Sequence, residues 1–220
     1  MKDYYSRKLN AEKLSLCYEI APPRVRQYLE AEIRYSLQFI QKGDVIIELG
    51  CGYGRALTRF SEKCAIAIGI DTSHESLVYG REKGLNIPFV TTNASNLCFR
   101  DQTFDRVFCI QNGLSAFKLN PRDLVCESLR VLKPGGTAVF SSYSEQFWED
   151  RLEWFRIQSR YDLIGEIDEL KTMNGVIVCK DGFTAKTIYP NDFLSISQGL
   201  GASVMIEEVD ASSIFMILSK

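Results

Sequence analysis

The stretch from Val45 to Arg55, which reads Val-Ile-Ile-Glu-Leu-Gly-Cys-Gly-Tyr-Gly-Arg, constrains the fold of this chain more than any other. An apolar β-branched run ends in an acidic residue, and a loop with glycines at positions 50, 52 and 54 follows at once. Glycine lets the backbone turn sharply and approach a ligand closely, because no Cβ stands in the way. Apolar residues at helical spacing come next: Ala56, Leu57, Phe60 and Cys64. This order of strand, glycine loop and helix predicts a doubly wound α/β sheet with a cofactor crevice at the carboxyl end of its first strand.

The glycine spacing distinguishes this loop from two other nucleotide-binding loops. The dinucleotide fingerprint requires a third glycine three positions after the second, and Arg55 occupies that position. A Walker-type phosphate loop would need Gly-Lys-Ser/Thr, which does not follow here. The loop therefore makes a dehydrogenase the weakest of the alternative functions.

Three further segments follow in a consistent order. Residues 65–71 form an apolar run that ends at Asp71, about 20 residues after Gly50, where doubly wound folds place a ribose-binding carboxylate. Asp71 before Thr72 and Ser73 would also suit a plain helix N-cap. The second segment, residues 92–107, contains Thr-Asn-Ala-Ser-Asn-Leu and then Asp-Gln-Thr-Phe-Asp-Arg-Val. In the third, residues 129–136, we expect Pro134 to end a helix and the glycine pair after it to form a turn.

Together these four segments, in order from Val45 to Phe140, resemble the class I S-adenosylmethionine-dependent methyltransferase family. The resemblance implies a Rossmann-like, doubly wound, seven-stranded and mostly parallel sheet, with an antiparallel last strand and helices on both faces. It also implies S-adenosylmethionine as cofactor and S-adenosylhomocysteine as product. The positions that it places at the cofactor are Glu48, Gly50, Cys51, Gly52, Gly54, Asp71, Thr72, Asn93, Ala94 and Gln111.

Two of these positions leave alternatives open. Asn93 stands where the family commonly has Asp, and its amide oxygen can accept a hydrogen bond from the adenine amine. A turn residue is the alternative, because Asn favours turns. Glu48 would contact the methionine amino group in the resembled family, or it would cap the glycine loop, and we expect a mixed role.

Methyl transfer mainly requires that the acceptor is positioned in line with the sulfonium methyl in a dry pocket. The sequence identifies no catalytic base. Candidates for contact with the acceptor are Gln111, Asn112 and Tyr143 at strand ends, and Tyr4, Tyr5 and Tyr18 in the amino-terminal segment. The sole histidine, His74, is expected at the surface or at the edge of the cofactor site.

The chain is expected to form one domain with four parts. Residues 1–42 supply amino-terminal helices, and residues 43–142 form the cofactor-binding core. Residues 143–189 form an insert over the substrate site, with a hairpin around Asp181 and Gly182. Residues 190–220 supply the last helix and a hairpin of strands.

The insert combines aromatic and acidic residues. Both tryptophans, Trp148 and Trp154, lie in it. Eight acidic residues lie between residues 145 and 170: Glu145, Glu149, Asp150, Glu153, Asp162, Glu166, Asp168 and Glu169. Aromatic faces beside carboxylates would suit an amine acceptor, whereas an ordinary amphipathic helix would show the same composition. The amine is therefore a hypothesis beside the simpler explanation.

The net charge and the cysteines restrict which binding partners and which cellular compartment we expect. A net charge of −2 without a basic run does not favour nucleic acid, and residues 110–114 lack the Asn/Asp-Pro-Pro-Tyr/Phe motif of enzymes that methylate bases or glutamine. No apolar run has the length of a membrane span, and the amino terminus is too charged for a secretory signal. The seven cysteines are expected as buried thiols of a cytoplasmic protein, with no metal site. We therefore expect a cytoplasmic monomer or homodimer that methylates a small molecule; a protein methyltransferase or a non-catalytic cofactor-binding protein are the alternatives.

Overall fold

The computed structural model describes Tyr4 and residues 8–220, and its main feature is a seven-stranded sheet in the order β3-β2-β1-β4-β5-β9-β8. The strands are β1 (Val45–Leu49), β2 (Ile66–Asp71), β3 (Phe89–Thr91), β4 (Phe104–Cys109), β5 (Leu132–Tyr143), β8 (Ser203–Val209) and β9 (Ser213–Ser219). The pairs from β3 to β5 are parallel, and β9 runs antiparallel to both of its neighbours. The predicted sheet, with its antiparallel last strand, is confirmed.

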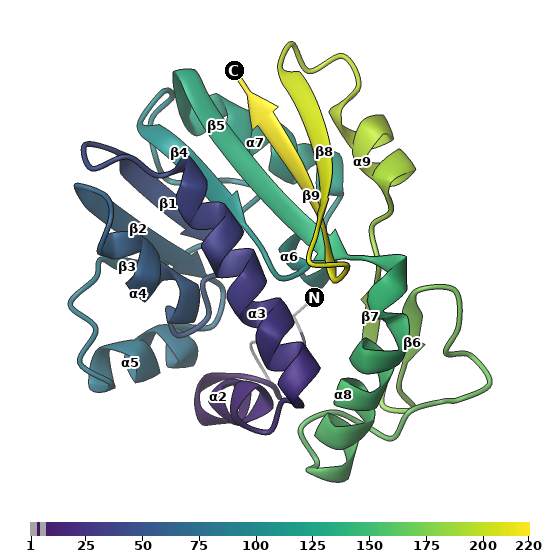
Figure 1. The fold of residues 1–220 in the computed structure, drawn as a ribbon. Helices are drawn as coiled ribbons and strands as arrows, with labels where there is room; N and C mark the ends of the chain where they lie inside the picture. Colours follow the sequence, from purple (N-terminus) through teal and green to yellow (C-terminus); the bar gives the residue numbers. More distant parts are fainter. Residues whose placement is uncertain (1–3, 5–7) are drawn as a thin grey trace.

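Helices cover both faces of the sheet (Figure 1). On one face lie α3 (Pro23–Ser36), α4 (Arg55–Ser61) and α5 (His74–Glu82); on the other lie α7 (Pro121–Val131) and α9 (Pro190–Ser197). Each face of the sheet has its own hydrophobic core. Ile33 and Phe60 pack with Phe108 and Phe215 on the first face, and Leu124 of α7 belongs to the core on the second face. Short helices η1 (Leu37–Phe39) and α6 (Gly113–Ala116) complete the layers.

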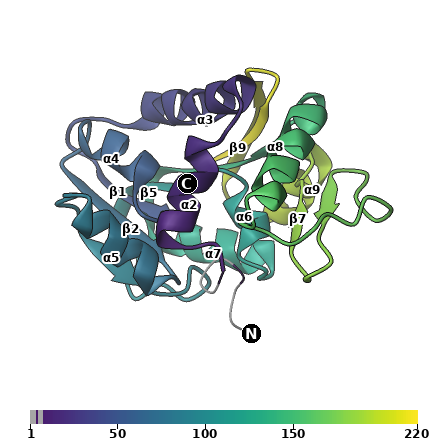
Figure 2. The same cartoon turned by 90° about the horizontal axis from the view of Figure 1, so that it is seen from below.

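A third core lies beyond the carboxyl ends of the parallel strands. It joins α2 (Ala11–Glu19) to η2 (Glu145–Phe147), α8 (Trp148–Arg160) and the hairpin of β6 (Val176–Val178) and β7 (Thr184–Lys186). Viewed from below, α2 lies between α5 and α8 (Figure 2). Fully buried Arg151 ties α8 to the hairpin, because its guanidinium donates to Thr187 Oγ1 and to the carbonyls of Gly175 and Ala185. The insert and the amino-terminal segment are thus packed as one body over one edge of the sheet.

The turn after α7 differs from the prediction. The helix already ends at Val131, and Pro134 lies inside β5. The Gly135 amide donates to the Lys220 carbonyl, and the Lys220 amide donates to the Gly136 carbonyl. The helix thus ends before Pro134, but the glycine pair does not form a separate turn: it lies inside β5, where the pairing with β4 is irregular between Leu132 and Thr137.

The cysteines also depart in part from expectation. Cys17, Cys51, Cys109 and Cys179 are buried, whereas Cys98 and Cys126 are exposed. Cys126 is exposed because it lies on the outer side of the amphipathic helix α7, away from buried residues such as Leu124 and Val125. All seven thiols are free.

Within Tyr4 and residues 8–220, no helix combines the length and the apolar character needed to cross a bilayer.

Candidate functional site

The glycine loop between β1 and α4 forms the floor of a pocket at the carboxyl ends of the parallel strands. The carbonyl of Ile70 accepts hydrogen bonds from the amides of Gly50 (2.8 Å) and Cys51 (2.9 Å), which fastens the loop to β2. Gly52 has a φ of 56°, and a Cβ there would lie 2.8 Å from Cδ2 of Leu14. Any other residue would have to adopt this left-handed conformation and displace the Leu14 side chain of α2, so the position favours glycine.

Asp71, at the end of β2, holds the loop as well as facing the pocket. Its Oδ2 accepts from the Gly52 amide at 2.8 Å, and its Oδ1 accepts from the Ser73 amide at 2.8 Å. The helix cap is Ser73, whose hydroxyl accepts from the Ser76 amide. Asp71 therefore holds the backbone of the glycine loop from β2 and also lines the pocket.

Glu48 is buried at the end of β1, with 5% of its surface exposed. Burial raises the pKa of Glu48 to about 8, against the opposing effect of the Arg55 charge. Its Oε2 is buried without a hydrogen-bond partner. A ligand ammonium at this point would satisfy that oxygen and favour the ionised carboxylate.

The chain turns abruptly after β4. Gln111 and Asn112 both have positive φ values, 56° and 60°, a backbone conformation that side-chain-bearing residues rarely adopt and that concentrates at functional sites. The Gln111 amide donates to Ser141 Oγ at 2.8 Å and to Glu32 Oε2 at 3.1 Å. This turn directs the Gln111 side chain into the pocket and the Asn112 side chain away from it, toward Lys186 and Ser142.

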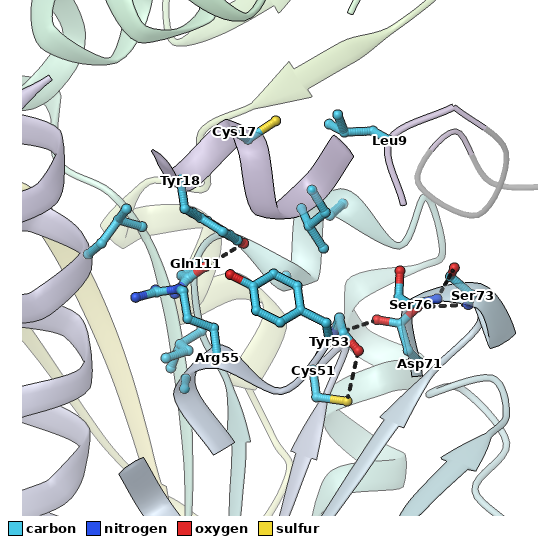
Figure 3. Close-up of a pocket in the computed structure, with 18 of the residues that line it drawn as sticks. Leu9, Cys17, Tyr18, Cys51, Tyr53, Arg55, Asp71, Ser73, Ser76 and Gln111 are labelled. Atoms are coloured by element: carbon cyan, nitrogen blue, oxygen red, sulfur yellow. Dashed lines mark hydrogen bonds between the residues drawn. The ribbon is translucent and has the colours of Figure 1, made fainter. Parts of the chain in front are cut away.

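Helix α2 forms the roof of the pocket (Figure 3). The Tyr18 hydroxyl reaches down and donates to Gln111 Oε1 at 3.1 Å. The Cys17 thiol donates to Gln158 Oε1 at 3.4 Å, and the Trp154 indole donates to the Cys17 carbonyl at 3.0 Å. These bonds join the roof to β4 and to α8, so a ligand in the pocket would be largely shielded from water.

Aromatic side chains make up the wall away from Asp71. Tyr28 of α3, Tyr143 of β5, and Trp154 and Phe155 of α8 all line this side. The Tyr28 hydroxyl is buried and has no hydrogen-bond partner. The pocket therefore combines a polar floor, suited to a nucleoside, with an aromatic chamber.

The structure brings most of the predicted site residues together. Those that line the pocket are Glu48, Gly50, Cys51, Gly52, Asp71, Thr72, Gln111, Tyr18 and Tyr143. Among the residues described, those that do not line it are Tyr4, Gly54, Asn93, Ala94 and Asn112. Asn93 is exposed, and its Oδ1 accepts from the amide and hydroxyl of Ser95, the geometry of a turn residue. Tyr5 lies outside the described residues.

One tyrosine candidate and the histidine form their contacts outside the pocket. The Tyr4 hydroxyl donates to Asp181 Oδ2 at 2.7 Å. His74 is exposed, and its Nδ1 lies 3.2 Å from Thr91 Oγ1.

No site role was predicted from the sequence for two charged residues in or next to the pocket, Arg55 and Glu32. Arg55 served only to exclude a dinucleotide loop, although the structure places its side chain in the pocket wall. Glu32 is fully buried behind Tyr28, and its Oε1 has no hydrogen-bond partner. A signal was available for Glu32, since an acid beside Ile33 on the apolar stripe of α3 is unusual.

The acids of the insert lie on its outer surface. Glu153 pairs with Arg160, Glu166 with Lys180, and Glu169 with Arg156. The aromatic chamber thus receives its tryptophan from the insert but not these carboxylates.

Comparison with known proteins relates the chain to methyltransferases. A family profile described as a methyltransferase domain matches residues 46–136. Malonyl-[acyl-carrier protein] O-methyltransferase of Marinomonas sp. (strain MWYL1) is 33% identical over 127 residues, which cover 55% of this chain and 46% of that protein. Demethylmenaquinone methyltransferase of Paenarthrobacter aurescens (strain TC1) is 30% identical over 105 residues, covering 48% of this chain and 41% of the relative. The chain thus spans less than half the length of these two relatives.

A solved structure shares the fold. The SAM-dependent methyltransferase from Aquifex aeolicus has a TM-score of 0.61 at 18% identity, with 93% of this chain and 96% of that chain covered. The matched 46–136 segment contains the glycine loop, Asp71 and the end of β4, which are the parts that form the pocket floor.

Proposed function

The chain belongs to the class I S-adenosylmethionine-dependent methyltransferases, and from this premise we propose that it transfers a methyl group from S-adenosylmethionine to a small molecule. The proposal depends mainly on one observation: a single pocket under α2 is lined both by the glycine loop and Asp71 and by the aromatic chamber. The products are S-adenosylhomocysteine and the methylated acceptor.

The floor residues bind the cofactor in this proposal. Asp71 accepts the ribose hydroxyls beside Thr72, and the glycine loop allows the ligand to lie against the backbone. Glu48 and Gln111 face the methionine end. Asn93 and the Ala94 amide remain our proposed adenine contacts, although the Ser95 donors must then share Asn93 Oδ1 or release it.

The acceptor would occupy the aromatic chamber. Tyr18, Tyr28, Tyr143 and Trp154 surround it, and in-line attack needs only that the nucleophile is held against the methyl carbon. The sulfonium leaves as a neutral thioether, so a base is needed only for an acceptor that carries a proton. The enclosure under α2 favours a small molecule over a folded protein as acceptor.

An amine acceptor is the finer part of the proposal. The acids of the insert lie at the surface, so they do not support an amine acceptor. The aromatic walls and the buried carboxylates Glu48 and Glu32 do support it. We also propose a cytoplasmic location, which the seven free thiols favour. A monomer or a homodimer is compatible with this proposal.

The test begins with calorimetric titration of the protein with S-adenosylmethionine, S-adenosylhomocysteine and NADH, beside Asp71→Ala. We expect micromolar binding of both adenosyl compounds, no binding of NADH, and a loss of at least tenfold in the variant, because hydrogen bonds to a charged group contribute roughly 1.5–3 kcal/mol. Asp101→Ala is the control, since Asp101 is exposed and pairs with Arg130 away from the pocket. Binding of NADH alone, or of none of the three compounds, would overturn the proposal.

Labelled methyl donor then separates the alternatives. Label in a metabolite pool supports the proposed activity, label in the macromolecular fraction indicates a protein methyltransferase, and binding without turnover in either indicates a non-catalytic cofactor-binding protein.

A further inference from the structure

Two buried polar groups on α3 lie beside the aromatic chamber without a hydrogen-bond partner. The Tyr28 hydroxyl and Glu32 Oε1 are both buried, and neither forms a hydrogen bond of normal geometry with any residue that the structure describes. Burying a polar group in this way is costly, and an acid more so than a hydroxyl. The packing of α3 against the sheet requires neither group, so their presence calls for another explanation.

Tyr28 and Glu32 form a path that leads from the pocket into the protein. They lie four residues apart on α3, so their side chains are neighbours on one face of the helix. Tyr28 lines the pocket, and Glu32 lies behind it. An acceptor in the chamber would therefore meet the tyrosine first and the acid only through it.

Glu32 also has a structural contact, which uses its other oxygen. Its Oε2 accepts a hydrogen bond from the Gln111 amide at 3.1 Å, in the turn of positive φ after β4. Holding this turn requires an acceptor but no charge, and an amide oxygen would serve equally. Neither Oε1 nor the Tyr28 hydroxyl takes part in this contact.

The protonation states of the two groups suit a transfer between them. Burial raises the pKa of Glu32 to about 7, an effect that the Ser141 hydroxyl, the Arg55 charge and the Tyr28 hydroxyl oppose. An acid of this pKa can accept a proton at neutral pH. Burial also raises the pKa of Tyr28 well above its ordinary value, so this hydroxyl gives up its proton only when it receives another. The remaining groups that face Glu32 lie on β4, β5, β9 and the turn after β4: Cys109, Tyr143, Ser213 and the Gln111 amide.

We propose that Glu32 takes, through Tyr28, the proton that the acceptor loses when it is methylated. The inference rests on the proposed function, because it assigns a role within that methyl transfer. The acceptor's proton passes to the Tyr28 oxygen while the proton of Tyr28 passes to Glu32 Oε1. At the same time the methyl carbon bonds to the attacking atom, and the electron pair of the broken C–S bond stays on sulfur. The carboxylate and the sulfonium are both neutral afterwards, so atoms and charges balance.

This role defines the class of acceptor. Its attacking atom carries a proton, as a hydroxyl or an amine does, and the proton has to be placed somewhere in a chamber with aromatic walls. Tyr28 would touch the acceptor and act as a catalytic residue, whereas Glu32 acts through it.

Glu32→Gln and Tyr28→Phe test the relay, because each keeps the shape of its side chain and removes the proton transfer. Calorimetry with S-adenosylhomocysteine should give the same affinity for both variants as for the unmodified protein, which shows that the cofactor site is intact. NMR of protein labelled with carbon-13 at the glutamate carboxyls then follows Glu32, whose signal is the one missing in Glu32→Gln. Tyr28→Phe should raise the midpoint of this titration, because the Tyr28 hydroxyl lowers the pKa of Glu32 against the larger effect of burial.

Single-turnover transfer of label from S-adenosylmethionine to a metabolite pool, between pH 5.5 and 9, gives the rates. The unmodified protein should transfer label faster as pH rises through about 7. Both variants should be roughly 100- to 10,000-fold slower at pH 8, as for the loss of general-base catalysis, and Glu32→Gln should lose the rise through pH 7. Glu48, whose pKa is raised to about 8, is present in every protein compared, so its effect is shared.

Two controls lie on the same helix. Glu30→Gln changes an exposed acid that pairs with Arg59. Tyr35→Phe removes a hydroxyl that donates to Glu207 Oε2 at 2.6 Å, away from the pocket. Both should transfer label at the rate of the unmodified protein.

The outcomes separate the inference from the function on which it rests. If Glu32→Gln is slow but keeps the rise through pH 7, Glu32 only holds the Gln111 turn and the relay is wrong. An unchanged rate in either variant, or a Glu32 titration that Tyr28→Phe does not move, also overturns the relay and leaves the proposed function standing. If S-adenosylhomocysteine does not bind the unmodified protein, or no metabolite takes up label, the proposed function fails and the relay with it.

Discussion

Glu32 is the buried acid whose behaviour is easiest to measure apart from any ligand. Burial raises the pKa of Glu32 to about 7 from an unperturbed 4.5. The groups that face it are Tyr28 on its own helix, Ser141 and the Gln111 amide at the ends of β5 and β4, Ser213 of β9, and the more distant Arg55, Tyr143 and Cys109. Apart from Tyr143 and Cys109, these neighbours favour the charged form but do not offset the burial.

The linkage sign follows from this raised pKa. Between pH 4.5 and about 7 the folded protein holds a proton on Glu32 that the unfolded chain has released, so stability falls as pH rises through this window. A gap of about 2.5 between the two pKa values corresponds to roughly 3 kcal/mol. We expect Glu32→Gln to remove this decline, because the amide stays neutral and can still accept from Gln111.

Urea unfolding at pH 5, 6, 7 and 8 measures the effect. The difference in unfolding free energy between variant and unmodified protein should grow in favour of Glu32→Gln up to pH 7 and then level off. Glu48, whose pKa is raised to about 8, should lower the stability of both proteins alike as pH rises to about 8, so its effect cancels in the difference. A difference that stays constant across the four pH values would contradict the assignment.

The sequence indicated which residues lie at the pocket where a motif fixes the backbone, but not where tertiary contacts decide. Gly52 and Asp71 were identifiable because the loop geometry requires them. Arg55 was not, because its side chain is enclosed only once α2 folds over it. Asn93 shows the reverse case: its position in the motif suggested the pocket, yet a local Asx turn holds its oxygen.

At the scale of elements, Arg151 is the residue on which the insert depends most. It is fully buried and its guanidinium lies 4.1 Å from the centroid of the Tyr143 ring. Arg151→Met would leave a hydroxyl and two carbonyls of the hairpin segment without their donor. We expect a loss of roughly 2–4 kcal/mol in unfolding free energy, because buried polar groups left unsatisfied cost about 1–3 kcal/mol each and part of the cost is relieved by water.

Chemical denaturation and amide hydrogen exchange of residues 175–187 would check this prediction. Arg156→Met is the control on the same helix, since Arg156 is half-buried and pairs with the exposed Glu169 at the surface, and a surface pair contributes at most about 1 kcal/mol. Equal losses in the two variants, or unchanged exchange in the hairpin, would show that Arg151 does not hold the insert.

The elements themselves were predictable to different degrees. Strands β1 and β2 are largely apolar runs, which is typical of parallel strands buried on both faces, and their ends were located within a residue or two. The hairpin was predicted around Asp181-Gly182, and β6 and β7 pair on either side of that turn. The packing of α2 against α8 could not be read from the sequence, because it depends on contacts such as Cys17 with Gln158 across 141 positions.

In the whole molecule, the pocket lies between a rigid sheet and a roof that is fastened at its edges. Helix α2 is bonded to α5 through the Ala11 amide and Ser76 Oγ, and the segment before it is fastened to the insert. There, Asp181 Oδ2 accepts from the Tyr4 hydroxyl at 2.7 Å and from Lys8 Nζ at 2.9 Å. Because α2 covers the pocket, we expect a bound nucleoside to leave when this roof moves, and such opening steps often limit release.

We therefore expect the contacts that hold the roof to set the rate at which a bound ligand dissociates. Asp181→Asn removes the charge that holds Lys8 without changing any residue that lines the pocket, so S-adenosylhomocysteine should dissociate roughly two- to fivefold faster, as expected for loss of an exposed ion pair. Stopped-flow displacement followed by the fluorescence of Trp154, which contacts the roof at Cys17, would measure the rate. Glu166→Gln is the control, because it breaks a pair with Lys180 inside the insert and does not touch the roof. If Asp181→Asn and Glu166→Gln release the ligand at the same rate, the pocket must open by another route, through movement of α8 or of the turn after β4.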